Sequence, residues 1–262
     1  MLRYLRLYGA FLRFAFGRAV QFRLDFFFRV FMDVLWYAQY LFFFDVLYAH
    51  SNTIGGWTRE QGFVFTGALF VVDALQMTVF ANNLWSIPTL INGGDLDYHL
   101  VRPVSSLFMA SLRDFAVSSF LNLLMAISVL IYALASYSQP LPAAHLVVFV
   151  GLLLAGLLVH YVLHILSVIP VFWTQSPSGF RELFWTIDPA MARPVDVYRG
   201  WVRRVLTTVL PLGIIVSFPC RALFEGPSAS LVAHTLLVTG IGLGVVGFLW
   251  RRGLRAYASA SS

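Results

Sequence analysis

Apolar residues form six long runs along the chain, and short polar stretches separate them. The runs lie at about 24–47, 62–85, 107–135, 145–172, 205–222 and 230–250. The hydrocarbon core of a bilayer is about 30 Å thick, so a helix needs about 20 apolar residues to cross it. The pattern predicts an all-α polytopic membrane protein in which residues 1–262 form one domain with six transmembrane helices. Pro211 and Pro219 interrupt the fifth run, so we expect that helix to be kinked.

The composition agrees with a membrane location and excludes several kinds of site. Apolar residues make up 59% of the 262 residues and charged residues only 11%, which is unlike an ordinary soluble domain. Cys220 is the only cysteine, so the chain can form neither an internal disulfide nor a cysteine-rich metal site. All 18 basic residues are arginines that lie at the ends of apolar runs. This arrangement is typical of membrane orientation and argues against nucleic-acid binding.

The distribution of arginines also predicts which side each loop occupies. If the N-terminus is cytoplasmic, only Arg59 and Arg221 lie on the outer side, and all other arginines lie on the cytoplasmic side. Short loops rich in arginine resist translocation. We therefore expect both termini in the cytoplasm. We also expect residues 173–204, which carry several arginines and turn-forming dipeptides, to form a cytoplasmic surface segment of short helices and turns.

The first twenty residues differ from the runs that follow. On a helical wheel Arg3, Arg6 and Arg13 share one face, and aromatic and leucine side chains cover most of the other. Such an amphipathic helix is expected to lie in the membrane interface, with Gly17 letting the chain turn into the first span. The alternative is a simple charged lead-in to that span.

A polar stripe runs along the second apolar run. Stepped at the helical angle, its members fall within an arc of about 100°; they are Gly62, Thr66, Asp73, Gln76 and Asn83. Such a face avoids lipid, and two explanations remain open. It either packs tightly against another helix or lines a substrate path. Asp73 also leaves open an ion-coupled secondary transporter, because a deep membrane acid can bind a proton or a sodium ion.

Two histidines in the fourth run, His160 and His164, are four residues apart and so share a helix face. This spacing allows both to bind one metal, which keeps a membrane-embedded metalloenzyme as an alternative. No acid lies near them in the sequence, so we favour packing or cavity-lining roles and predict no metal site. The chain has no lysine to complete a P-loop, and it has no G-x-S-x-G or H-E-x-x-H motif. We therefore predict no catalytic residues and no cofactor in this chain.

The stretch "NGGDLDYHLVRPVS", residues 92–105, interrupts the apolar sequence between the second and third runs. Gly93 and Gly94 permit a tight turn. Asp95 is suited to cap a short helix, and Asp97 lies favourably in its first turn. Leu96 and Leu100 are four residues apart and predict an exposed apolar pair. Arg102 is followed by Pro103, which ends the helix, so the pattern indicates a short rigid knob beneath the membrane.

These residues resemble a known family. "GGDLDYHLVRPVSSLF" is similar to the "G-x-LD-x-x-L-x-RP" signature of the permeases of type-two ATP-binding-cassette (ABC) exporters, specifically a branch long catalogued as a family of unknown function. The tail "WRRGLRAYASASS" is similar to the ending of the same family. The resemblance covers nearly the whole chain. It implies an efflux permease of the bacterial inner membrane, which pairs with an identical or homologous second permease and docks on cytoplasmic ABC ATPase subunits that bind ATP and magnesium.

The resemblance also implies a role for the 92–105 segment. In such permeases the first cytoplasmic loop carries a coupling helix that fits a cleft on the ATPase. The residues that match this loop, and that we expect to make the ATPase contact, are Gly93, Gly94, Asp95, Leu96, Asp97, Leu100, Arg102 and Pro103. A membrane scaffold without transport activity is a further alternative, which the pronounced 92–105 segment makes less attractive.

Overall fold

The computed structural model describes residues 2–19, 23–175 and 179–257, and helices joined by short turns account for most of them. Four helical stretches in this part of the chain are long and apolar enough to cross a membrane: Val30–Ala49, Arg59–Asn92, Ala143–Thr174 and Ala229–Ala256. Ser119–Ala135 is a shorter apolar helix. The expected all-α polytopic membrane fold is confirmed.

The helices follow one another along the chain as α1 (Leu2–Ala19), α2 (Arg23–Ala49), α3 (Arg59–Gln76), the π-helix η1 (Met77–Ala81), α4 (Asn82–Asn92), α5 (Asp97–Leu100), α6 (Ser106–Leu112), α7 (Val117–Ala135), α8 (Ala143–Val168), α9 (Val171–Thr174), α10 (Gly179–Ile187), the 3-10 helices η2 (Asp188–Ala192) and η3 (Val195–Val197), α11 (Gly200–Thr208), α12 (Leu212–Ile215), α13 (Ser217–Phe224) and α14 (Ala229–Ala256).

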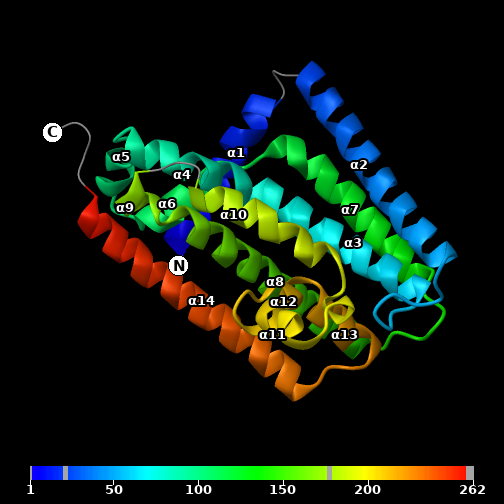
Figure 1. Ribbon diagram of the computed structural model, residues 1–262. Coiled ribbons are helices and arrows are strands. Elements are labelled where there is room, and N and C mark those ends of the chain that lie inside the picture. Colours follow the sequence, from blue (N-terminus) through cyan, green and yellow to red (C-terminus); the bar gives the residue numbers. More distant parts are fainter. Residues whose placement is uncertain (1, 20–22, 176–178, 258–262) are drawn as a thin grey trace.

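The centre of the bundle is formed by α3, α7 and α8, with α2 and α14 outside them (Figure 1). A side-chain atom at Gly67 would lie 2.8 Å from the Cα atom of Leu130, so the close approach of α3 and α7 requires glycine there. In an apolar stretch of 18 residues taken from each span, 72% of the residues are buried in Arg59–Asn92, but only 11% and 17% in the spans of α2 and α14. The outer helices therefore offer most of their apolar surface to lipid or to another protein.

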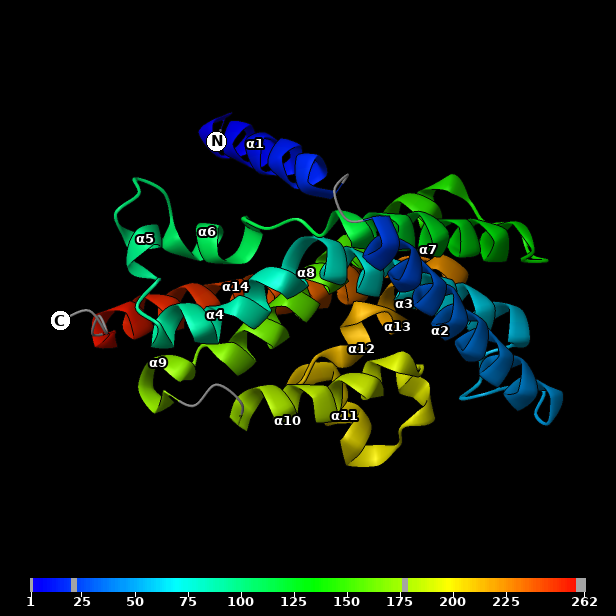
Figure 2. The same cartoon turned by 90° about the horizontal axis from the view of Figure 1, so that it is seen from above.

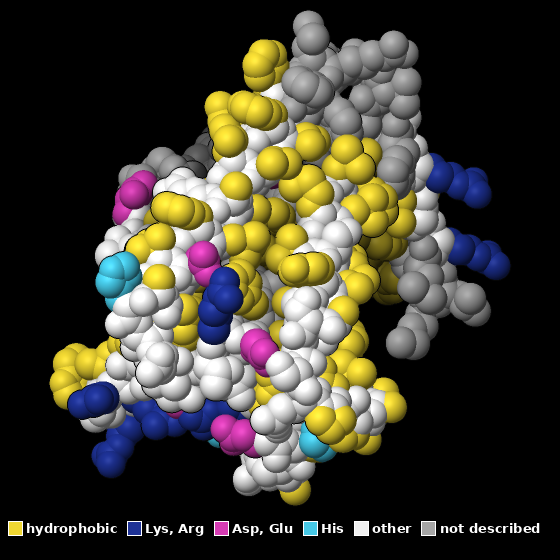
Figure 3. Space-filling model, turned by 90° about the vertical axis from the view of Figure 1, so that its right-hand side faces the viewer, with side chains coloured by type: hydrophobic (Ala, Val, Ile, Leu, Met, Phe, Trp, Pro, Cys, Tyr) yellow, Lys and Arg dark blue, Asp and Glu magenta, His cyan; other side chains and the backbone are white. Residues whose placement is uncertain are grey.

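The bundle has two distinct ends (Figures 1 and 2). α5, α6, α9 and the C-terminal part of α14 lie together at one end, which we call the α5 end. The connections 50–58, 136–142 and 225–228 lie at the other, which we call the loop end. Viewed from the loop end, hydrophobic side chains cover much of the surface, and charged side chains lie among them and gather toward the lower left (Figure 3).

The third span begins later than the sequence predicts. The expected helix at 107–135 is split into α6 and α7 by residues 113–116. The break is held by the second span, because the Asn83 side chain donates to the Asp114 carbonyl at 2.7 Å and accepts from the Asp114 amide at 2.8 Å. The Ala116 amide donates to the carbonyl of Thr78 in the π-helix η1 at 3.0 Å. The two irregularities thus satisfy each other's backbone groups.

The fifth crossing also differs from the prediction. Residues 205–222 form parts of three short helices, α11 to α13, instead of one kinked span. Residues 173–204 are not confined to one surface either. The Gln175 carbonyl accepts from Asn92 at the α5 end, whereas the Asp196 carboxylate accepts from the Trp57 indole near the loop end. The chain passes from one end of the bundle toward the other between these residues.

This path corrects the assignment of arginines to the two sides. Arg203 was predicted to be cytoplasmic and Arg221 to be outside, yet both pair with the same carboxylate, Asp196. Counting arginines fails here because it treats 173–204 as a loop on one side, whereas the folded chain pairs both arginines with one buried carboxylate.

The N-terminal helix α1 lies beside α6 and also contacts α7 (Figure 2). The Tyr4 hydroxyl accepts from the Ser105 amide at 3.3 Å, and its ring meets Phe108 edge-on at 4.9 Å. Arg6 and Arg13 are exposed. α1 continues through Gly17 to Ala19, so the turn expected at Gly17 is wrong, and the connection to α2 falls on residues 20–22, outside the described residues.

Candidate functional site

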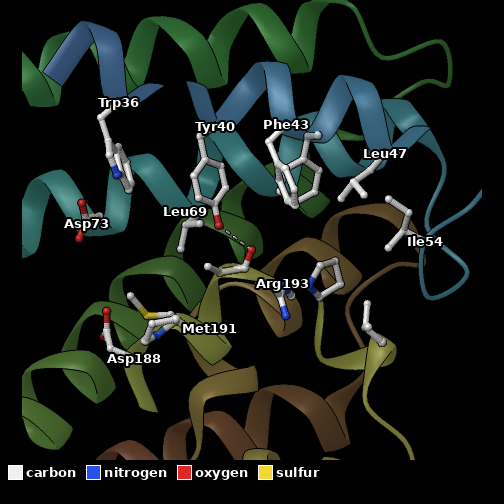
Figure 4. A pocket seen from close by; sticks show the side chains of 15 residues that line it. Trp36, Tyr40, Phe43, Leu47, Ile54, Leu69, Asp73, Asp188, Met191 and Arg193 are labelled. Carbon is white, nitrogen blue, oxygen red and sulfur yellow. Dashed lines mark hydrogen bonds between the residues drawn. The ribbon is translucent and has the colours of Figure 1, made fainter. Parts of the chain in front are cut away.

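A cavity of about 570 Å³ lies between α2, α3 and residues 188–197, which we call the 188–197 segment (Figure 4). The side chains of Trp36, Tyr40, Phe43 and Leu47 point into it from α2. Leu69 and Asp73 face it from α3. The floor is formed by the 188–197 segment, and its lining residues are Asp188, Pro189, Met191, Ala192, Arg193, Pro194 and Val197.

Aromatic contacts fix the shape of the cavity wall. The Tyr40 hydroxyl donates to the Ala192 carbonyl at 3.0 Å, which ties α2 to the 188–197 segment across the cavity (Figure 4). The rings of Trp36 and Tyr40 lie 5.4 Å apart, and both contact Phe70 of α3. Because α2 is otherwise little buried, these aromatic contacts and the Tyr40 hydrogen bond set its position over the cavity.

Two carboxylates lie at the same end of the cavity, Asp73 on α3 and Asp188 on η2 (Figure 4). Asp188 is paired with His160 of α8, whose Nε2 lies 3.2 Å from the carboxylate oxygen. Since an ionised carboxylate only accepts hydrogen bonds, Nε2 is the donor. Asp73 makes no hydrogen bond or ion pair with the residues that the structure describes. Asp188 therefore has a direct hydrogen-bonding partner, whereas Asp73 interacts with His160 only at longer range.

A small polar space lies next to the cavity and contains both histidines. The Gln76 side chain lies 3.3 Å from Nδ1 of His164, and the Phe184 ring stacks on that imidazole with centroids 4.7 Å apart. The space holds only about 20 Å³. Asp73, Asp188 and His160 border it as well. No acid lies near His160 in the sequence, but the fold brings Asp188 to it. Within the described residues, no group of three side chains that could hold a metal ion occurs.

The residues of the polar stripe in the second span occupy two kinds of position. Asp73 and Gln76 face the cavity and the histidine space, as a lining role requires. Thr66 is buried and donates to the carbonyl of Gly62, and Asn83 holds the α6–α7 break. The π-helix η1 lies between Gln76 and Asn83, so the regular helical angle used to align the stripe does not apply across it. Thr66 and Asn83 therefore make contacts within the protein, whereas Asp73 and Gln76 line cavities, and a substrate path along the stripe stays a prediction.

The 92–105 segment forms the second candidate site. Gly94 has a φ of +81°, which confirms the expected glycine turn. The helix α5 follows, but its N-cap residue is Leu96, with no side-chain hydrogen bond, so the predicted Asp95 cap is wrong. Leu96 is fully buried, and its amide donates to the Leu90 carbonyl at 3.0 Å. The predicted exposed leucine pair is therefore wrong for Leu96, whereas Leu100 is exposed as expected.

Other side chains provide the exposed apolar surface of this segment. Tyr98 is 68% exposed, Leu100 41% and Val101 81%. His99 is buried on the opposite side, with Nε2 lying 3.5 Å from the Arg113 guanidinium. Burial, and then the charges of Arg113 and Arg102, lower the pKa of His99. The segment thus has a buried anchoring face and an exposed apolar face.

The structure places the residues predicted for the two sites far apart. The predicted residues of the 92–105 segment, from Gly93 to Pro103, lie together at the α5 end, in the glycine turn and in α5. Asp73 lies near the middle of the continuous stretch Arg59–Asn92 that leads to it. Sequence reasoning missed Asp188, Tyr98 and Val101. The dipeptide Asp188-Pro189 was the only local signal for the first, and periodicity cannot show which face of a four-residue helix is buried.

Comparison with protein families gives one match. The family described as ABC-2 family transporter protein matches residues 34–261. This range includes both candidate sites, α2 from residue 34 onward and all the later spans. We found no match among curated proteins or among solved structures.

Proposed function

The chain belongs to the ABC-2 transporter family, and on that premise we propose that it is the permease subunit of an ABC exporter in a bacterial inner membrane. In this proposal, ATP and magnesium bind to separate cytoplasmic ATPase subunits, and two permeases, identical or homologous, form the membrane part. The α5 end faces the cytoplasm, where the ATPase would meet it. The chain itself contributes no catalytic residue and no cofactor site.

The observation that carries the proposal is the two-sided 92–105 segment. Tyr98, Leu100 and Val101 expose a compact apolar face beyond the bundle. Apolar and aromatic side chains of this kind are the usual anchors of a protein interface. The buried Leu96 and His99 make the segment a firm part of the permease instead of a free loop. A partner protein that binds the exposed face and moves would therefore also move the helices on which the segment packs.

A continuous route connects this segment with the cavity. α5 packs on α6, and α6 packs on α4. α4, η1 and α3 form one uninterrupted span from Arg59 to Asn92, which carries Asp73 on the cavity wall. We infer that closure of the ATPase pair displaces the 92–105 segment and tilts this span, opening the cavity alternately to the two sides. ATP binding can bias that equilibrium only through contacts that differ between the two states.

Co-purification tests the proposal. A tagged permease is extracted from its native host in mild detergent and compared with the double variant Tyr98→Ala/Val101→Ala. We expect an ABC ATPase to co-purify with the original protein and to fall about tenfold or more in the variant, because its interface anchors are removed. The matched control is Trp201→Ala, which truncates an equally exposed aromatic residue on α11, away from the α5 end.

Two outcomes would contradict the assignment. If no ATPase accompanies the original protein, the exporter proposal fails, and transport driven by an ion gradient through Asp73 becomes the better explanation. If the ATPase stays bound to the double variant as strongly as to Trp201→Ala, the ATPase contact lies elsewhere on the permease.

A further inference from the structure

The cavity between α2, α3 and the 188–197 segment combines an aromatic wall with an excess of negative charge. We propose that it binds a hydrophobic organic cation, and that molecules of this chemical class are the cargo of the exporter. The identification as cargo rests on the proposed function, whereas binding in the cavity is a property of this chain alone.

The charges of the lining favour a cation. Asp73 and Asp188 provide two carboxylates, against the single guanidinium of Arg193. His160 donates a hydrogen bond to Asp188 from α8, and Nε2 lies 3.2 Å from the carboxylate oxygen. Asp73 has no hydrogen-bond or ion-pair partner among the described residues. A carboxylate in a membrane span that has no direct hydrogen-bond or ion-pair partner is costly, and a bound cation would remove much of that cost.

The wall of the cavity suits the remainder of such a ligand. Trp36, Tyr40 and Phe43 present aromatic rings from α2, and Leu69 adds apolar surface from α3. Aromatic faces attract cations, and the attraction is stronger where water is excluded. The volume of about 570 Å³ lies within the range of pockets that enclose drug-sized molecules. The cavity can therefore take a cation together with a bulky apolar body.

The position of the cavity also indicates how the ligand enters. Trp36 is 44% exposed and Phe43 48% exposed, so the aromatic wall reaches the outer surface of the bundle. α2 is the least buried of the spans that line or surround the cavity. A hydrophobic cation that partitions into the membrane could thus enter sideways, beside α2, and place its charge against Asp73 at the inner end (Figure 4).

A pair of ions with the same shape and opposite charge tests the inference. Binding of labelled tetraphenylphosphonium and of tetraphenylborate is measured by equilibrium dialysis on the purified permease, without ATPase and without ATP. We expect the phosphonium to bind saturably. Asp73→Asn should weaken it about tenfold, and Asp188→Asn should weaken it in the same direction. The control Asp45→Asn removes an α2 carboxylate that pairs with Arg59 and does not line the cavity, so it should leave binding unchanged.

The possible results separate the ligand class from the proposed function. Equal phosphonium binding by the original protein and Asp73→Asn would overturn the inference, provided that both elute as folded protein on size-exclusion chromatography. Saturable borate binding that is lost in Arg193→Gln would overturn it in favour of an anionic ligand. If phosphonium does not bind but the ATPase co-purifies, the cation class fails and the exporter assignment stands. If it binds to a protein that has no ATPase partner, the site is supported and the exporter assignment fails.

Discussion

The 188–197 segment and the 92–105 segment both interrupt the longer helices of this protein, and they differ in where their side chains find partners. The 188–197 segment is bound from several sides by its own chain. Asp196 accepts from the Trp57 indole at 2.9 Å and pairs with Arg203 and Arg221, and the Val195 amide donates to the Ser217 hydroxyl at 3.0 Å. The 92–105 segment instead leaves Tyr98, Leu100 and Val101 exposed.

The difference indicates what each segment is for. Within the apolar depth of a membrane protein, an irregular segment persists only where the protein satisfies its polar groups, and the 188–197 segment meets that condition. An exposed apolar surface at the end of a span has no such requirement and is typical of a site that binds another chain. Substitutions should therefore affect stability in the first segment and partner binding in the second.

The largest expected effect is on stability, from removal of the Asp196 carboxylate. The side chain of Asp196 is 8% exposed, and Asp196→Ala leaves the guanidinium of Arg221 and the indole of Trp57 without their acceptor. Loss of one partner of a buried ion pair costs about 3 kcal/mol. We expect a clearly lower unfolding temperature in detergent, measured by tryptophan fluorescence or by static light scattering.

A surface ion pair provides the comparison for that measurement. Asp45 pairs with Arg59 near the loop end and has a side chain that is 51% exposed. Asp45→Ala should cost at most about 1 kcal/mol, because exposed pairs contribute little. Equal shifts in the two variants would show that the Asp196 contacts do not hold the 188–197 segment.

A smaller effect on stability is expected within the 92–105 segment, and only on its buried face. Leu96→Ala should cost about 2 kcal/mol, since it leaves a cavity where a fully buried side chain packs. Val101→Ala, on the exposed face, should change stability by less than about 0.5 kcal/mol. Unfolding temperatures of the two variants check this. If Val101→Ala proved as destabilising as Leu96→Ala, the exposed face would already be covered within the permease itself.

The smallest effect is expected from the protonation of His99. Its pKa is lowered in the folded protein by burial and by the charges of Arg113 and Arg102, so the unfolded chain binds a proton more readily. Stability is therefore full above the ordinary pKa of histidine and falls as the pH drops below it. Unfolding temperatures between pH 7.5 and 5.5 should decline less in His99→Gln than in the original protein. The same decline in both would assign the pH dependence to other groups.

The sequence predicted some parts of the site and missed others for identifiable reasons. The turn at Gly94 was predicted because glycine is the residue that readily adopts a positive φ. Asp73 and Gln76 were predicted because polar residues in an apolar helix share a face. Asp188 was missed because it reaches His160 from 28 positions away, through a segment without helical periodicity. The sequence could not show that Leu96 is buried and Val101 exposed, because this depends on how the segment packs on the rest of the bundle.

By itself, the sequence determined that this is an all-α membrane protein, because the length and apolar content of its runs suit a bilayer whatever their partners. It also determined where the glycine turn and the amphipathic first helix lie, since both depend on neighbouring residues. Only the tertiary structure decided that α6 and α7 are separate, that Gln175 and Asp196 lie toward opposite ends of the bundle, and which acids face the cavity. Those features depend on which distant groups satisfy one another, and local periodicity carries no information about that.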